Sequence, residues 1–159
     1  MVQSAYLETT IVSYFCARPS RDLIIAAQQE ITRVWWQERL PHYRIVISDF
    51  VLREAMAGDD LAAKNRISAL NPFALLDITA EVEKLADWFL QKSLVPKKKL
   101  IDALHISVAA VHGIDYLLTW NCSHIANAEM RAAISFACDE MGYKCPTICT
   151  PQELMGQDL

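Results

Sequence analysis

The sequence has little glycine and no long apolar run, and each absence excludes a class of protein. Only 4 of the 159 residues are glycine and 53% are hydrophobic. This composition is typical of a compact, helix-rich globular chain rather than a disordered one. No stretch approaches the roughly 18 uncharged apolar residues of a membrane span, so we expect no contact with a membrane. The length suits one folding unit, and we expect a single domain over residues 1–159.

The sequence also lacks the positive charge of a general nucleic-acid binder. Its formal net charge is −4, whereas proteins that bind nucleic acid through their overall charge are normally basic. Any action on a polyanion therefore has to be local, through a metal ion or a small basic patch. The start "MVQSAYLETT" lacks the features of a signal peptide, and the 5 cysteines form no CxxC pair. We therefore expect reduced thiols and a cytoplasmic protein.

Short runs with strand character alternate with helical patterns along the chain. The expected strands are 4–7, 43–48, 73–78, 114–120 and 146–150. The expected helices are 9–16, 20–40, 49–56, 61–70, 80–94, 100–112 and 127–141. Thr9 or Thr10, Ser20 and Ser48 are the expected N-caps of the first three helices. The alternation predicts an α/β fold with a mostly parallel sheet and helices on both faces.

Oxygen-bearing side chains occur at the predicted carboxyl ends of the strands, where such folds bind their ligands. They are Glu8 at the end of the first strand, Glu54 in the helix after the second, Asp102 at the start of helix 100–112, and Asn121 at the end of the fourth strand. Hard oxygen donors of this kind suit Mg²⁺ or Mn²⁺. A carboxylate-held ion with open coordination positions is typical of enzymes that cleave phosphodiesters.

Each of these residues, taken alone, also has an ordinary structural explanation. Glu8 can extend into solvent at a strand end, and Glu54 can pair with Arg53 on an exposed helix face. Asp102 can serve the dipole of its helix, and Asn121 can be a turn residue. Only the joint pattern favours a metal site.

Two histidines and several cations accompany these positions. His105 lies one turn after Asp102 on the same face, as a supporting or a core residue. His124 follows Asn121 and is a candidate to orient a water, contact a phosphate or cap the next segment. The candidates for contact with a nucleic-acid backbone are Lys97, Lys98, Lys99, Arg18 and Arg21. Solvated loop residues explain these cations equally well.

Four segments together resemble PIN-domain proteins, and in particular the bacterial toxin-like ribonucleases of the virulence-associated protein C (VapC) type. The segments are "YLETTIVSYF", "ISDFVLREAMAGD", "DALHISVAAVHGIDYLLTWNCSHIAN" and "GYKCPTICTPQEL". The resemblance covers nearly the whole chain and is most specific between Asp102 and Asn127. It implies a three-layer PIN-like fold whose central sheet has four to five short strands, and an acidic cluster that binds Mg²⁺ or Mn²⁺.

The resemblance also implies an activity and partners. The activity is metal-dependent cleavage of RNA by a metal-activated water, in a toxin that is held inactive by a cognate antitoxin. Members of this family commonly dimerise, and the helix expected at 20–40 is rich in apolar residues. We therefore expect a homodimer.

Carried over residue by residue, the acidic positions of the family fall on Glu8, Glu54, Asp102 and Asn121, and Thr10 matches the hydroxyl residue two positions after the first acid. Two of these positions depart from the family pattern. The first acid is normally Asp, and the extra methylene of Glu8 moves its carboxylate by about 1.5 Å. Asn121 removes one negative charge, which favours one metal ion over two. The alternative is a non-catalytic PIN-like binding or scaffold protein with a degenerate acidic cluster.

Overall fold

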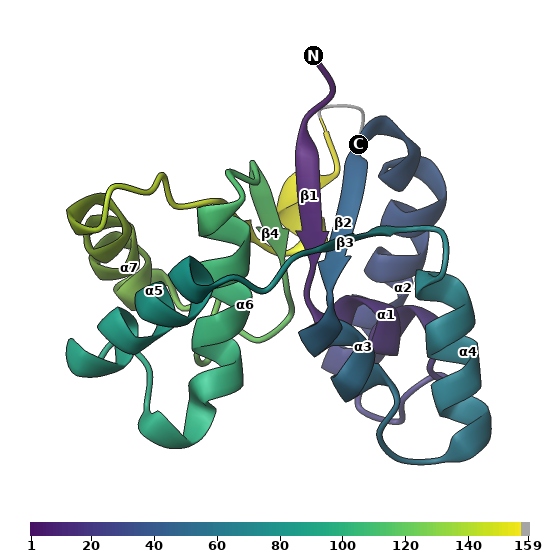
Figure 1. The fold of residues 1–159 in the computed structure, drawn as a ribbon. Coiled ribbons are helices and arrows are strands. Elements are labelled where there is room, and N and C mark those ends of the chain that lie inside the picture. Colours follow the sequence, from purple (N-terminus) through teal and green to yellow (C-terminus); the bar gives the residue numbers. More distant parts are fainter. Residues whose placement is uncertain (157–159) are drawn as a thin grey trace.

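The computed structural model describes residues 1–156, which build a five-stranded parallel sheet covered by helices on both sides (Figure 1). The strands are β1 (Ser4–Leu7), β2 (Arg44–Ser48), β3 (Ala74–Leu76), β4 (Tyr116–Leu118) and β5 (Thr147–Cys149). Their spatial order is β3-β2-β1-β4-β5, and every neighbouring pair is parallel. The expected α/β fold class is confirmed, and within the described residues the sheet is wholly rather than mostly parallel.

The connections between the strands are helical. The helices are α1 (Thr9–Cys16), α2 (Leu23–Glu38), α3 (Asp49–Ala55), α4 (Asp60–Leu70), α5 (Ala80–Gln91), α6 (Leu100–Val111) and α7 (Ala128–Glu140), and the 3₁₀ turns are η1 (Leu40–His42), η2 (Lys97–Lys99) and η3 (Pro151–Leu154). Figure 1 shows α1 to α4 on one side of the sheet and α5 to α7 on the other. In the described part of the chain, no helix has the length and apolarity needed to cross a membrane.

The first two helices begin with acidic caps instead of the expected hydroxyl caps. Glu8 is the N-cap of α1 and accepts the N–H of Thr10, so Thr9 and Thr10 are the first residues of the helix. Asp22 caps α2, where its side chain accepts two backbone N–H groups, and the expected cap Ser20 lies outside the helix. An ionised carboxylate accepts stronger hydrogen bonds than a neutral hydroxyl does, and its negative charge interacts favourably with the positive end of the helix dipole.

Ser48 occupies the N-cap position of α3 as expected, but its side chain makes no capping bond. Its hydroxyl lies 2.7 Å from the hydroxyl of Tyr6 instead. A tertiary contact between β2 and β1 has therefore replaced the local bond that the sequence pattern predicts. The described strands also end within the expected ranges, because pairing with neighbours covers only part of each apolar run.

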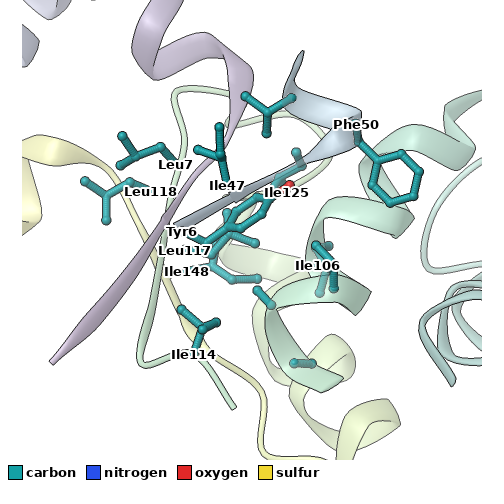
Figure 2. Packing of buried hydrophobic residues seen from close by; sticks show 14 of the residues in the cluster. Tyr6, Leu7, Ile47, Phe50, Ile106, Ile114, Leu117, Leu118, Ile125 and Ile148 are labelled. Atoms are coloured by element: carbon teal, nitrogen blue, oxygen red, sulfur yellow. The ribbon is translucent and has the colours of Figure 1, made fainter. Parts of the chain in front are cut away.

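Apolar side chains pack on both faces of the sheet. The parallel register pairs Tyr6 with Leu117 and Leu7 with Leu118, so successive pairs point to opposite faces. Figure 2 shows Tyr6 and Leu117 on the side of α6, near Ile106, and Leu7 and Leu118 on the opposite side. Burial of each large apolar side chain stabilises the fold by about 1.5–3 kcal/mol. The strands β1, β2 and β4, whose carboxyl ends lead to the candidate site residues, are thus packed in the hydrophobic core.

The tryptophans belong to this packing. Trp35 is fully buried, and Trp36 and Trp88 are partly buried against the core. Trp36 also stacks on Phe15 with a centroid separation of 4.1 Å. Their burial indicates that these tryptophans pack in the core and are not exposed platforms for stacking nucleic-acid bases.

Candidate metal centre

The acidic residues gather beyond the carboxyl ends of the central strands. Glu8 follows β1 directly, and Glu54 lies on α3, which follows β2. One carboxylate oxygen of Glu8, one of Glu54 and a ring nitrogen of His105 all lie within 4.8 Å of one another. Asp102 is not part of this closest group, but it lies in the first turn of α6, one turn before His105. The parallel topology therefore brings together residues from three separate parts of the chain.

Glu8 is held through only one of its two oxygens. The side chain is buried, with 4% of the residue exposed, and its Oε2 accepts hydrogen bonds from Thr10 Oγ1 at 2.5 Å, Thr119 Oγ1 at 2.7 Å and the Thr10 N–H at 3.2 Å. From residues 1–156, no donor reaches Oε1. Burial raises the pKa of Glu8, although the charge of His105 and the threonine hydrogen bonds act in the opposite direction. The site thus contains a carboxylate that is costly to ionise without a compensating cation.

Glu54 shows the same arrangement in a more open position. Its Oε1 accepts hydrogen bonds from Thr9 Oγ1 at 2.7 Å and from His105 Nε2 at 2.6 Å. Its other oxygen, Oε2, has no hydrogen-bond donor among the residues that the structure describes, and 37% of its side chain is exposed. Burial raises the pKa of Glu54, but the hydrogen bond and charge of His105 and the bond from Thr9 outweigh it, so the pKa is lowered. Glu54 is therefore ionised at neutral pH.

Asp102 is the least satisfied of the three acids. It is 7% exposed, and its Oδ2 is fully buried with no hydrogen-bond partner in the described part of the chain. Burial raises its pKa, while His105, His124 and Lys99 lower it and the charge of Glu54 raises it further. A buried carboxylate oxygen without a donor is costly unless a cation compensates it. Because Asp102 is outside the closest group, its Oδ2, which has no partner within residues 1–156, is a second, independent indication of a cation site at this edge.

The donor set fits a hard divalent cation. Glu8, Glu54 and Asp102 each keep at least one carboxylate oxygen without a donor from residues 1–156. Oxygen ligands from one or a few carboxylates, with remaining positions open to water, are what Mg²⁺ and Mn²⁺ accept. The structure thus contains a candidate metal site at the carboxyl edge of the sheet.

Asn121 has a local role that the sequence left open. It lies beyond Leu118, the last residue of β4, and not at the strand end itself. Its Oδ1 accepts the backbone N–H of His124 at 3.1 Å, and its own N–H donates to Thr119 Oγ1 at 2.9 Å. This is the bonding expected of a turn residue. His124 is close enough to Asp102 for its charge to lower the pKa of that carboxyl.

The cations that the sequence singled out differ in their surroundings. Lys99 is partly buried, and its charge lowers the pKa of Asp102. Lys97 and Lys98 are exposed on η2, which directly precedes α6. Arg18 is exposed and lines a hollow of about 460 Å³ between α1 and α4, and Arg21 is exposed in the α1–α2 loop. The lysines thus lie next to the helix that carries Asp102.

Several supporting side chains were not expected from the sequence. Thr119 bonds to Glu8 and Thr9 bonds to Glu54, while Tyr6 and Ser48 connect to His105. The contact between Thr119 and Glu8 follows from the strand pairing, because Thr119 comes directly after Leu118, and Leu118 pairs with Leu7, the residue before Glu8. The sequence alone does not show that β4 lies next to β1, so it could not predict this contact.

Comparison with known proteins places the fold. No protein-family model matches this chain, and no similar sequence was found among curated proteins. Among solved structures, the chain is similar to one from the crystal structure of VapBC2 from Rickettsia felis bound to a DNA fragment from their promoter. The TM-score is 0.55 at 16% identity, and the match covers 93% of this chain and 98% of that chain.

The fold defined by this match is a VapC-like PIN fold. It agrees with the all-parallel sheet and the two helical layers, and it confirms the fold that the four sequence segments implied. At 16% identity the likeness concerns the fold.

Proposed function

We propose that this protein is a metal-dependent endoribonuclease of the PIN-domain type, in which Glu8, Glu54 and Asp102 hold Mg²⁺ or Mn²⁺. The observation that carries the proposal is the incomplete bonding of these buried or half-buried carboxylates, above all the buried Oδ2 of Asp102. A bound divalent ion at this place supplies polarisation of the scissile phosphate and activation of the attacking water.

The other residues of the site have supporting tasks in this proposal. The hydroxyl of Thr10 fixes Oε2 of Glu8, and His105 fixes Oε1 of Glu54. Asn121 and His124 lie in the turn after β4, where they position a water or a phosphate oxygen. In this proposal the cations that contact the RNA backbone are Lys97, Lys98, Lys99, Arg18 and Arg21, all exposed except the partly buried Lys99.

The proposal extends to partners. The similar structure is that of VapBC2, which supports assignment of this chain as the toxin of a cytoplasmic toxin–antitoxin pair. We also propose a homodimer of a single-domain chain, because exposed apolar residues such as Leu23 and Ile24 lie at the start of α2. Light scattering should then show twice the 18.0 kDa mass of the chain, and co-expression with a cognate antitoxin should suppress toxicity.

A non-catalytic PIN-like binding protein is the second candidate. It is favoured by Glu8 in place of the family's Asp and by Asn121, whose Oδ1 already accepts a backbone N–H. Such a protein is expected to keep the fold and to bind metal weakly, without cutting RNA.

Cleavage of a mixed-sequence RNA with Mg²⁺, Mn²⁺ or EDTA separates the two candidates. We expect cutting with either metal, none with EDTA, and loss of cutting in Asp102→Asn. Thermal unfolding with and without Mn²⁺ shows whether the site binds an ion. Stabilisation by Mn²⁺ without cleavage would favour the non-catalytic protein. Cutting that persists in Asp102→Asn would mean that the chemistry lies elsewhere.

A further inference from the structure

A chain of buried hydrogen bonds runs from the second strand to Glu54. The hydroxyls of Ser48 and Tyr6 lie 2.7 Å apart, and the Tyr6 hydroxyl lies 2.7 Å from Nδ1 of His105. Nε2 of His105 lies 2.6 Å from Oε1 of Glu54. Ser48, Tyr6 and His105 have no exposed surface, so the part of the chain on β2, β1 and α6 is shielded from water, and only Glu54 on α3 is partly exposed.

The direction of the hydrogen bonds follows from the chemistry of the last member. The carboxylate of Glu54 only accepts, so Nε2 of His105 carries a proton and donates it to the bond. When the imidazole is neutral, Nδ1 accepts from the Tyr6 hydroxyl; when it is protonated, Nδ1 donates to the Tyr6 oxygen, and Nε2 donates to Glu54 in both cases. The Tyr6 and Ser48 hydroxyls share the next hydrogen bond, in which the Tyr6 oxygen accepts from Ser48 when Tyr6 donates to His105. Each bond thus fixes the orientation of the next group, and the chain ends on Oε1 of Glu54.

The chain is anchored in the buried core of the molecule. Figure 2 shows the Tyr6 ring among core side chains between the sheet and α6, near Leu117 and Ile106. The ring centroids of Tyr6 and His105 are 5.8 Å apart. Phe and Leu at these two positions would fill similar volume without burying polar atoms, and such replacements are often neutral for stability. The polar chain therefore has a use beyond packing, and its one member with substantial exposure is Glu54, at 37% of the side chain.

We propose that Tyr6 and His105 are positioning residues that hold Oε1 of Glu54 and so leave Oε2 free for the cation. The inference rests on the proposed function, since it needs a cation at the carboxyl edge. It adds Tyr6 and Ser48, which belong to the core of the sheet, to the residues on which the site depends. Partners that orient metal ligands in this way typically change metal affinity by about 10–100-fold when removed.

The test is the Mn²⁺ affinity of the metal-free protein, measured by titration calorimetry without any RNA. Tyr6→Phe removes the hydroxyl and keeps the ring, and we expect Mn²⁺ binding to weaken by about tenfold or more. Tyr116→Phe is the matched control. Tyr116 pairs with Ala5, one position before the Tyr6–Leu117 pair, and its hydroxyl lies 3.4 Å from Gln3, away from the chain of hydrogen bonds. The Tyr116→Phe variant should bind Mn²⁺ as tightly as the natural protein.

Two further variants separate positioning from folding. His105→Gln keeps an amide donor for Glu54, so it should bind Mn²⁺ more tightly than His105→Leu. The double variant Tyr6→Phe/His105→Leu replaces both polar partners by apolar groups, and we expect it to stay folded and to bind Mn²⁺ weakly. A purely structural role would change the melting temperature and leave the affinity of the folded variants unchanged.

The outcomes distinguish the inference from the function on which it rests. If the natural protein binds Mn²⁺ and the folded variants bind it equally well, the positioning role is overturned and the metal site stands. If the natural protein does not bind Mn²⁺, the proposed function and the positioning role fall together. Weaker binding in Tyr6→Phe, with partial recovery in His105→Gln relative to His105→Leu, supports the inference.

Discussion

Asp115 at the amino edge of the parallel sheet and two carboxylates at its carboxyl edge, Glu8 and Asp102, have pKa values shifted in opposite directions. At the amino edge, Asp115 directly precedes β4, and its Oδ2 accepts the N–H of Ser4 at 2.8 Å and the Ser4 hydroxyl at 3.0 Å. These hydrogen bonds lower the pKa of Asp115, which is exposed to water. At the carboxyl edge, Glu8 and Asp102 are buried, and burial raises the pKa of both.

The difference shows that the acidic residues of one sheet serve two purposes. Asp115 is solvated and joins β4 to β1 through Ser4, so its negative charge stabilises the fold. Glu8 and Asp102 have lost water without gaining a full set of donors from residues 1–156, so their charges oppose folding, a cost that a bound cation would offset. An acidic residue at a sheet edge thus indicates a cation site only when its carboxylate lacks hydrogen-bond donors from the protein.

The largest expected contrast between the edges is in catalysis. Glu54→Gln removes the charge of a proposed metal ligand at the carboxyl edge, and on that proposal RNA cleavage should fall by about a hundredfold or more. Asp115→Asn makes the same kind of change at the amino edge and should leave cleavage unchanged. Initial rates with Mg²⁺ at saturating RNA measure both. Equal losses in the two variants would mean that the edges do not differ in function.

The next contrast concerns the length of Glu8. Glu8→Asp withdraws the carboxylate by about 1.5 Å from the hydroxyls of Thr10 and Thr119, which now hold it at 2.5 and 2.7 Å. Because the pocket is bonded to the longer side chain, we expect cleavage to fall by about tenfold or more. Thr119→Val should lower the rate of the natural protein more than that of Glu8→Asp. A higher rate for Glu8→Asp would show instead that the family's Asp geometry remains the better one.

A smaller effect is expected on the stability of the metal-free protein. Burial raises the pKa of Glu8, so the folded state binds the proton more tightly than the unfolded state. The contribution of protonated Glu8 to the free energy of unfolding is therefore complete below the ordinary glutamate pKa of about 4.3. It is lost as the pH rises through the raised pKa of the folded state. Glu8→Gln should raise the free energy of unfolding at pH 7 by about 0.5–2 kcal/mol, with a smaller gain in acid.

Urea unfolding of the metal-free natural protein and of Glu8→Gln, at neutral pH and at about pH 4.3, measures this difference. The urea must be combined with a chelator so that no cation occupies the site. A variant that is less stable than the natural protein at neutral pH would contradict the view that the Glu8 charge opposes folding.

The smallest effect is expected at the amino edge, with the opposite sign. The backbone hydrogen bond from Ser4 lowers the pKa of Asp115, so its contribution is present above the ordinary aspartate pKa of about 3.9 and is lost as the pH falls. Asp115→Asn should lower stability at neutral pH by less than about 1 kcal/mol, since the group is exposed and screened. Thermal unfolding at pH 7 detects the change, and stabilisation by the variant would remove the proposed contrast.

Much of this fold is predictable because its signals are local. The β1 strand has the expected limits, and α6 and α7 lie within one residue of the expected limits at each end, since apolar periodicity and capping residues such as Asn127 act within a few positions of the chain. The placement of Glu8, Glu54 and Asp102 at the carboxyl edge follows from the same alternation of strands and helices. Their roles as metal ligands stay predictions.

The tertiary structure alone decided which donors each carboxylate keeps. Ser48 looks like a helix cap in the sequence, yet its hydroxyl bonds to Tyr6, because β1 and β2 become neighbours. Thr119 reaches Glu8 only because β4 pairs on the other side of β1. The sequence by itself determined the elements and the supply of acidic residues, which depend on short-range patterns. Strand order and burial, which depend on contacts far apart in the chain, determined that Asp115 is satisfied and Asp102 is not.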